Sequence, residues 1–283
     1  MREAALMGTE IDIAWADIAW DPLVGCTRKS AACRHCYAEA LTAENAQPGG
    51  WGHGFADGSG WSGKIELRED RLALPLGWGE SRRVFVNSLS DLFHESLDPA
   101  VIDRIFAVMA LAPQHVFLVL TKRPKTMQPY MADKAAPERI VKAMDELAPG
   151  TARETPAWPL PNVWLGVTAE NQKEADRRIP LLLETPAALR FIAAEPLLEK
   201  LDLKSGIWLR PAGSGARIDW VVAGGETGAQ GNACQPDWAR SLRDQCAAAA
   251  TAFFWNQWGQ HIPEGGADAR RLLDGLQHAA LPV

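Results

Sequence analysis

The chain has 283 residues, of which 47% are hydrophobic and 23% charged, so it is long enough for one large domain with a substantial core. Its net charge of −6 argues against a protein that coats nucleic acid by electrostatics alone. No stretch approaches the roughly 18 consecutive apolar residues of a membrane span, and the first residues lack the apolar core of a signal peptide. We therefore expect a cytoplasmic protein with no membrane association.

Short apolar runs typical of strands alternate with helical patterns along almost the whole chain. The predicted strands are 11–20, 84–88, 116–120, 163–167, 190–194, 220–223 and 252–255. The predicted helices are 38–45, 99–112, 136–147, 171–184 and 236–249. Such alternation implies parallel strands joined by crossover helices. We expect a single α/β domain over residues 1–283, a partial (β/α)6-type TIM barrel in which residues 47–63 form a long loop or lid.

Three of the five cysteines fall within eleven residues, between a predicted strand and a predicted helix. Cys26, Cys33 and Cys36 have the spacing C-x6-C-x2-C, which departs from the C-x3-C-x2-C of most radical S-adenosylmethionine enzymes. Three thiolates suit an iron–sulfur cluster with one iron left open, the position where S-adenosylmethionine binds in radical enzymes, whereas four would close the site.

Two other classes of protein stay open on the same cysteines. One is a non-catalytic iron–sulfur protein with a redox or scaffold role. The other is a zinc-stabilised binding module in which His35 or another histidine adds a ligand, although neighbouring ligands at positions 34–36 would strain a tetrahedral site.

Polar residues follow each predicted strand, where the carboxyl ends of barrel strands share one mouth. An S-adenosylmethionine site needs an acidic or hydroxyl group for the amino end of the ligand and a cation for its carboxylate. Ser90 and Asp91 are candidates for the amino end, and Lys122 or Arg123 for the carboxylate.

Later strand ends offer candidates for the nucleoside part of the ligand. Gly224 and Gly225 would let the backbone approach an adenine or ribose closely, and Glu226 would accept hydrogen bonds from ribose hydroxyls. Glu195 is a further candidate at the mouth. A tight turn for the glycines and an ion pair for Glu195 are the alternatives, and no residue is singled out as catalytic.

Eight segments together carry a family resemblance. They are Ala19–Cys26 (AWDPLVGC), Cys33–Glu39 (CRHCYAE), Ser90–Glu95 (SDLFHE), Leu120–Pro124 (LTKRP), Asn162–Val167 (NVWLGV), Glu195–Leu198 (EPLL), Gly224–Gly228 (GGETG) and Asn256–Gly259 (NQWG). In combination they resemble the phage-associated three-Cys-motif family, a domain of unknown function regarded as radical S-adenosylmethionine-like. The resemblance to spore photoproduct lyase, which repairs thymine dimers in DNA, is more distant.

The resemblance implies a barrel of radical S-adenosylmethionine type and a [4Fe–4S] cluster on Cys26, Cys33 and Cys36. It implies that S-adenosylmethionine is cleaved to a 5′-deoxyadenosyl radical, with an electron donor such as flavodoxin or ferredoxin. It suggests a separate three-Cys-motif partner protein and a nucleic acid or nucleotide substrate, in DNA repair or modification.

The basic residues provide a way to judge the nucleic-acid interpretation. The set to map is Lys64, Arg68, Arg71, Arg82 and Arg83. Clustered beside the mouth they would favour nucleic acid, and dispersed they would not. The acidic net charge favours a small or partner-delivered substrate over a long duplex.

Overall fold

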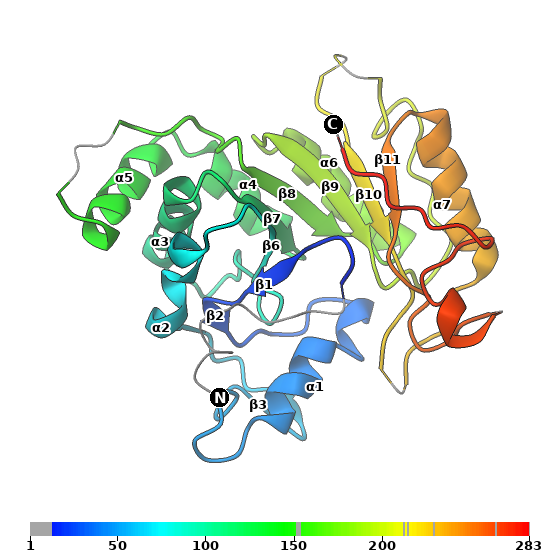
Figure 1. Ribbon diagram of the computed structural model, residues 1–283, viewed down its shortest axis with the longest axis horizontal. Helices are drawn as coiled ribbons and strands as arrows, with labels where there is room; N and C mark the ends of the chain where they lie inside the picture. The colour runs from blue at the N-terminus through cyan, green and yellow to red at the C-terminus, as the bar shows by residue number, and fades with distance from the viewer. Residues whose placement is uncertain are drawn as a thin grey trace. The chain divides into compact units, whose positions relative to one another are not determined.

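The computed structural model of the chain describes residues 13–150, 154–211, 213, 215–228, 230–263 and 265–282. They form a mixed α/β fold around a seven-stranded parallel sheet whose strand order, β1-β6-β7-β8-β9-β10-β11, repeats the chain order (Figure 1). Its strands are β1 Ile18–Trp20, β6 Arg83–Val86, β7 Val116–Thr121, β8 Val163–Thr168, β9 Leu189–Ala194, β10 Trp220–Ala223 and β11 Ala252–Trp255. All seven predicted strands are thereby confirmed. The sheet has one strand more than a (β/α)6 repeat would have.

Helices fill most of the crossovers between these strands. They are α1 Tyr37–Glu44, α2 Glu69–Leu72, α3 Pro99–Leu111, α4 Pro124–Ala132, α5 Ala136–Leu147, α6 Gln172–Glu184 and α7 Pro236–Ala248. Three 3-10 helices are η1 Ala31–Cys33, η2 Leu74–Gly77 and η3 Gly266–Ala269. The five predicted helices are confirmed to within one residue at each end. Between β9 and β10 no helix occurs in the described residues, so the strand–helix repeat is interrupted there.

The first predicted strand is shorter than expected. Residues 11 and 12 lie outside the described part of the chain, and Ala14 and Trp15 form a turn, so β1 begins only at Ile18. Helix α4 was missed because it begins on Pro124 and contains Pro129, and proline inside a helical pattern normally ends the helix.

The chain divides into two compact units, of which the first comprises Met1–Thr27, Ala38–Leu165 and Thr185–Ala188. It holds β1, β6, β7 and the first half of β8, and its helix α3 packs on α5. Asp98 caps α3 by accepting a hydrogen bond from the N–H of Ala100 at 2.9 Å. Trp20 is fully buried in this unit, and its indole N–H donates to the Arg71 carbonyl at 2.9 Å, so this donor has a partner in the core.

Residues 47–63, expected as a long loop or lid, belong to the first unit. They carry the hairpin of β3 (Ala56–Asp57) and β4 (Gly60–Trp61). A Cβ on Gly52 would lie 2.0 Å from the Thr42 carbonyl oxygen, so the segment contacts α1 through its backbone. A second small pair joins β2 (Leu23–Val24) to β5 (Glu66–Leu67).

The second unit comprises Arg28–Tyr37, Gly166–Glu184 and Leu189–Val283. It holds the second half of β8 with β9, β10 and β11, and α7 packs on β10 and β11. Trp220 is fully buried, and its indole N–H donates to the Ala280 carbonyl at 2.9 Å. Each unit therefore has its own core of buried strands and tryptophan.

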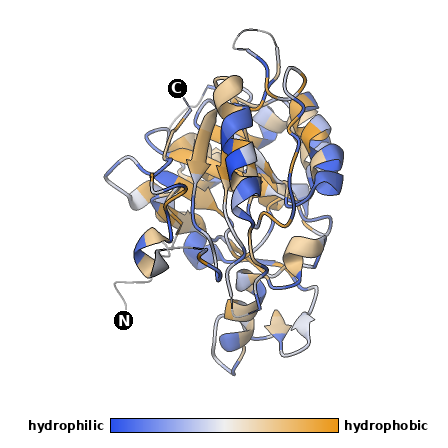
Figure 2. Cartoon of the chain, turned by 90° about the vertical axis from the view of Figure 1, so that its right-hand side faces the viewer, coloured by the Kyte–Doolittle hydropathy of each residue, from blue (hydrophilic) through white to orange (hydrophobic). Residues whose placement is uncertain are grey.

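Figure 2 colours the sheet strands mostly hydrophobic, whereas the helices carry hydrophilic stretches. This pattern is typical of strands buried by helices that face solvent on one side. Among the helices that the structure describes, none combines the length and apolar character needed to span a membrane.

Candidate functional site

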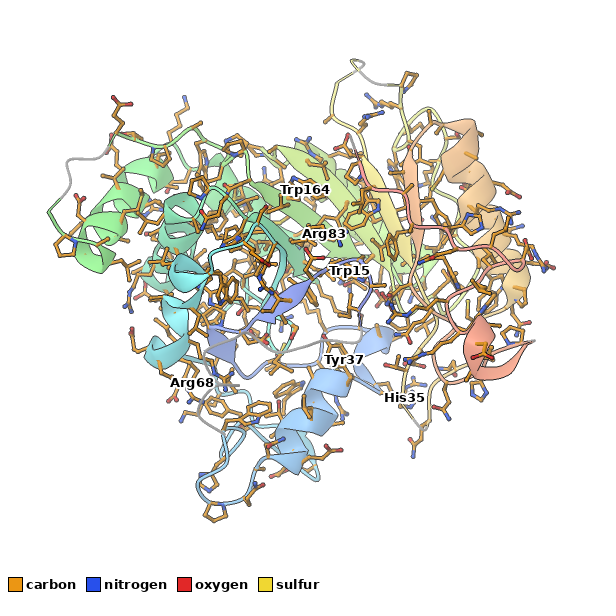
Figure 3. The ribbon with its side chains drawn as sticks, viewed as in Figure 1. Trp15, His35, Tyr37, Arg68, Arg83 and Trp164 are labelled. Carbon is orange, nitrogen blue, oxygen red and sulfur yellow. The ribbon has the colours of Figure 1, made fainter. Side chains whose placement is uncertain are left out.

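The cysteine motif lies on the loop between β2 and α1, which also carries His35 and leads into Tyr37 (Figure 3). Cys26 belongs to the first unit, whereas Cys33, at the end of η1, and Cys36, just before α1, belong to the second. Cys33 is buried, Cys26 and Cys36 are partly exposed, and all three are free of disulfides. Nowhere in the described ranges are three His, Cys, Asp or Glu side chains gathered so that they could hold a metal ion. The ligand role of the three thiols therefore stays a prediction.

The turn around Cys33 is held by main-chain hydrogen bonds. The Cys33 N–H donates to the Ser30 carbonyl at 3.0 Å, which closes the 3-10 turn. The N–H of Lys29 donates to the Cys33 sulfur at 3.3 Å. These two main-chain contacts hold the Cys33 sulfur within the turn.

Gly25 lets the chain pass from β2 to Cys26. Its φ is +97°, and a Cβ there would lie only 1.9 Å from the Lys64 carbonyl oxygen. Gly25 also forms a parallel bridge with Ser90, which follows β6. The glycine thus brings the residue before Cys26 beside the end of β6.

Thr27, the residue after Cys26, is fixed by two buried side chains of the first unit. Arg123 donates from Nη2 to the Thr27 hydroxyl at 2.7 Å and to its carbonyl at 3.1 Å. His94 Nε2 lies 2.7 Å from the same hydroxyl, while His94 Nδ1 accepts the Ser96 N–H at 3.2 Å. Because Nδ1 is the acceptor, the proton of neutral His94 is on Nε2, which donates to Thr27.

Asp91 completes this network below Arg123. Its carboxylate accepts hydrogen bonds from the Thr121 hydroxyl at 2.6 Å, the Lys122 N–H at 3.0 Å and the Phe93 N–H at 3.1 Å. The Arg123 guanidinium lies 3.9 Å from it and forms a closer ion pair with Glu95, at 2.8 Å. Both Asp91 oxygens are thus engaged within the protein, so the structure brings Asp91 and Arg123 together as supports of the loop. We call Thr27, Asp91, His94, Thr121 and Arg123 the Thr27 network.

Two polar atoms at the carboxyl end of β6 have no such partners. The Ser90 hydroxyl and the Asn87 side-chain nitrogen are shielded from solvent and have no hydrogen-bond partner among the described residues. Asn87 has a positive φ of 59°, and its side-chain oxygen accepts the Leu23 N–H at 3.2 Å. Such buried polar atoms need a partner, which a bound water or a ligand would supply. Asn87 was not predicted, although asparagine often adopts this conformation at strand ends.

Asp21 links the loop before the cysteines to the same strand end. Its carboxylate accepts from the Ser88 hydroxyl and the Leu89 N–H, both at 3.0 Å. Burial raises the pKa of Asp21 to about 6, because these two hydrogen bonds offset only part of the lost hydration.

Gly224 and Gly225, which follow β10 in the second unit, have no room for a side chain. A Cβ on Gly225 would lie 1.9 Å from the Trp258 carbonyl, and one on Gly224 would lie 2.7 Å from the Glu195 carboxylate. The Gly225 N–H donates to the Gln257 carbonyl at 2.7 Å. The protein itself therefore fills the space that a side chain would need at either position, and the approach of an adenine or a ribose to the glycine backbone stays a prediction.

The two glutamates at these strand ends also have internal partners. Glu195 accepts a hydrogen bond from the buried Asn256 at 2.7 Å. Glu226 is buried, accepts two hydrogen bonds from Asn232 at 2.6 and 2.7 Å, and faces His35 Nδ1 at 3.4 Å. The structure thus connects Glu226 to the cysteine loop, a contact that sequence spacing does not reveal.

A buried ion pair at the end of β8 was not predicted from the sequence. Arg178 and Glu170 are both fully buried and lie 2.8 Å apart, and Arg178 also donates to the Thr168 carbonyl at 2.8 Å. The Thr168 hydroxyl and the second Glu170 oxygen are shielded from solvent without a partner in the described residues. This strand end therefore also offers polar atoms for a ligand.

Most of the five basic residues singled out from the sequence are paired with acidic side chains. Four of them pair with a carboxylate: Lys64 with Glu66 at 2.7 Å, Arg68 with Asp70 at 3.3 Å, Arg82 with Glu80 at 4.0 Å and Arg83 with Asp17 at 2.6 Å. Arg83, labelled in Figure 3, is the first residue of β6 and Arg82 precedes it, whereas Ser90 follows the carboxyl end of that strand. Arg71 is half-buried, and burial lowers its pKa.

The remaining cysteines, Cys234 and Cys246, are buried, and burial raises the pKa of each thiol to about 12. Cys246 is a buried residue of α7, as expected from its position in the predicted helix. Neither thiol has the low pKa or the exposure of a reactive or metal-binding cysteine.

Parallel strands in chain order, with polar clusters at their carboxyl ends, define an α/β protein whose candidate ligand site lies at those ends. The chain belongs to the family described as "Protein of unknown function (DUF5131)", which it matches over residues 10–282. No curated protein and no solved structure matched the chain. The match shows membership of a family of unknown function, whereas the phage association and the radical S-adenosylmethionine type stay predictions.

Proposed function

We propose that the protein is a radical S-adenosylmethionine enzyme in which Cys26, Cys33 and Cys36 bind a [4Fe–4S] cluster. The observation that carries the proposal is the support given to the first cysteine: the buried Arg123 is used to fix Thr27, its neighbour. Burying an arginine is costly, and good pairing is needed to offset the cost. A solvated connecting loop does not require support of this kind.

The donor set fits such a cluster. The Cys33 sulfur already accepts a main-chain N–H, and the thiols of Cys234 and Cys246 are buried and protonated, so three cysteines remain as ligands. Three thiolates leave one iron of the cubane open. When bound and reduced, the cluster supplies the electron that cleaves S-adenosylmethionine to methionine and a 5′-deoxyadenosyl radical.

In the first unit, the residues beside Cys26 divide into two groups. Ser90 and Asn87 have unsatisfied polar atoms and would meet the methionine end of the ligand, the hydroxyl accepting from the amino group and the amide donating to the carboxylate. Lys122 is half-buried and is the remaining candidate cation for that carboxylate. Asp91 and Arg123 act as positioning residues through Thr27, because their own polar atoms are engaged.

We further propose that the parallel sheet is a partial barrel of the radical S-adenosylmethionine type, with its mouth at the strand carboxyl ends. The protein would there orient a substrate hydrogen and exclude water. The pairing of these cations with carboxylates favours a nucleotide or another small substrate over a long duplex. An electron donor such as flavodoxin or ferredoxin would complete the system.

The test is anaerobic reconstitution with iron and sulfide, followed by dithionite reduction and addition of S-adenosylmethionine. We expect 5′-deoxyadenosine to form with the native chain and to be lost in Cys36→Ala, with Cys246→Ala as the matched control that keeps the activity. A cluster that assembles without cleavage would contradict the proposal and favour a redox or scaffold role. Retention of zinc without iron would favour the zinc-stabilised module instead.

A further inference from the structure

We infer that Glu226 is a positioning residue that holds the cysteine loop through His35. The inference rests on the proposed function, because it assigns Glu226 to the support of a cluster rather than to a ribose. His35 lies between Cys33 and Cys36 on the loop before α1 (Figure 3), and its Nδ1 is 3.4 Å from the Glu226 carboxylate. A contact at His35 therefore restrains both cysteines of the second unit.

Glu226 is itself held rigidly, which a support requires. Its carboxylate oxygen Oε2 accepts from the Asn232 N–H at 2.7 Å and from the Asn232 side chain at 2.6 Å. Its carbonyl accepts the Gln260 N–H at 2.9 Å. A Cβ on Gly259 would lie 2.2 Å from that carbonyl oxygen, so the segment around Gly259 packs directly on the Glu226 backbone.

His35 faces this carboxylate with an otherwise unused atom. Its side chain is 21% exposed, against 4% for Glu226, so the contact is largely withdrawn from water. His35 Nδ1 is shielded from solvent and makes no hydrogen bond of good geometry within the described residues. The carboxylate is the group that Nδ1 approaches, and a small rotation of the ring would turn this approach into a charge-assisted hydrogen bond.

The same geometry engages one oxygen of the Glu226 carboxylate within the protein. Both Asn232 donors and His35 Nδ1 converge on Oε2. A ribose hydroxyl at Oε2 would have to displace one of them, which would leave a buried polar group unpaired. Through this oxygen, Glu226 connects the loop after β10 to the cysteine loop.

Because the contacts converge on one oxygen, two substitutions of Glu226 distinguish the loss of that oxygen from the loss of the charge. Glu226→Gln keeps a carbonyl oxygen where Oε2 lies, so it can preserve all three contacts. Glu226→Ala removes them. Glu199→Ala is the matched control, because Glu199 accepts the Gln172 N–H at the start of α6 and is not part of this contact.

The first experiment measures amide hydrogen exchange of residues 28–36 in the chain as isolated, without metal. We expect roughly tenfold faster exchange in Glu226→Ala, a change of less than about twofold in Glu226→Gln, and none in Glu199→Ala. Equal exchange in Glu226→Ala and the native chain would overturn the inference. So would Glu226→Gln behaving like Glu226→Ala, because the contact then would not depend on the accepting oxygen.

The second experiment uses the reconstituted protein and measures iron loss to a chelator together with the reduction potential of the cluster. We expect Glu226→Ala and His35→Ala to speed iron loss alike, and the double variant to add nothing. Additive effects would overturn the inference. Failure of the native chain to bind iron would overturn the proposed function only, because the exchange experiment needs no iron.

Discussion

Asp91→Ala tests whether the Thr27 network supports the first cysteine. The substitution removes an acceptor that binds the Thr121 hydroxyl at 2.6 Å and the Lys122 and Phe93 N–H groups at 3.0 and 3.1 Å. It also takes away one of the two carboxylates near the Arg123 guanidinium. The buried Phe93 N–H and the partly buried Lys122 N–H lose their acceptor, and part of the compensation for a buried cation is lost with it.

The expected loss follows from these contacts. Removing one partner of a buried ion pair costs about 3–5 kcal/mol, much of it from groups left without a partner. We therefore expect the free energy of unfolding to fall by about 4 kcal/mol and Tm by about 10 °C. Asp91→Asn should lose about half as much, because its oxygen still accepts from Thr121 and Phe93 while its amide nitrogen meets the Lys122 N–H.

Thermal and urea-induced unfolding at pH 7.5, followed by circular dichroism, would measure these losses. Asp98→Ala is the matched control: it removes the same charge but only the cap of α3, at a cost of about 1 kcal/mol. A loss in Asp91→Ala no larger than in Asp98→Ala would refute the reasoning, because the network would then carry no more stability than an exposed helix cap.

Three further outcomes are expected. Because folding raises the pKa of Asp21 from 3.8 to about 6, the folded state holds the proton more tightly, and this residue lowers stability as the pH rises from 4 to 6. Asp21→Asn should therefore be more stable than the native chain above pH 6, by up to about 3 kcal/mol, with the difference vanishing near pH 4, and equal melting curves at pH 7.5 would contradict this. Gly25→Ala should lower the free energy of unfolding in urea by about 3 kcal/mol or more, because its Cβ would lie 1.9 Å from a carbonyl oxygen. Gly63→Ala is the control: the nearest atom to its Cβ is 3.8 Å away, so the loss should be about 1 kcal/mol, from the positive φ alone. Iodoacetamide at pH 8 should leave Cys234 and Cys246 unmodified in the folded protein, as read by peptide mass spectrometry, and their rapid alkylation would disagree with the burial that raises both pKa values.

The sheet was predictable because each strand is a short apolar run bounded by polar residues. Val163–Thr168 and Ala252–Trp255, for example, read as buried strands without any knowledge of their neighbours. The placement of Ser90 and Asp91 at one strand end followed from the same pattern. Helix α4 could not be predicted, because its two prolines contradict the local helix signal and tertiary packing decides the outcome.

The roles of the strand-end residues were not predictable in the same way. Arg123 meets Thr27 across 96 residues of sequence, and Glu226 faces His35 through a contact that no local pattern encodes. Gly224 and Gly225 were candidates for a close approach to a nucleoside or for a tight turn, and only the structure shows that the Trp258 carbonyl and the Glu195 carboxylate exclude a side chain at both positions. Residue type and strand position indicate where a site lies, whereas register decides which of its residues are free to bind.

The electron paramagnetic resonance spectrum of the reduced, reconstituted protein tests the central claim most directly, recorded with and without S-adenosylmethionine. We predict the signal of a [4Fe–4S]⁺ cluster that shifts on addition of S-adenosylmethionine, because three cysteines leave one iron open to the ligand. A cluster signal that is identical in both samples would contradict the proposal that this chain binds S-adenosylmethionine at an open iron.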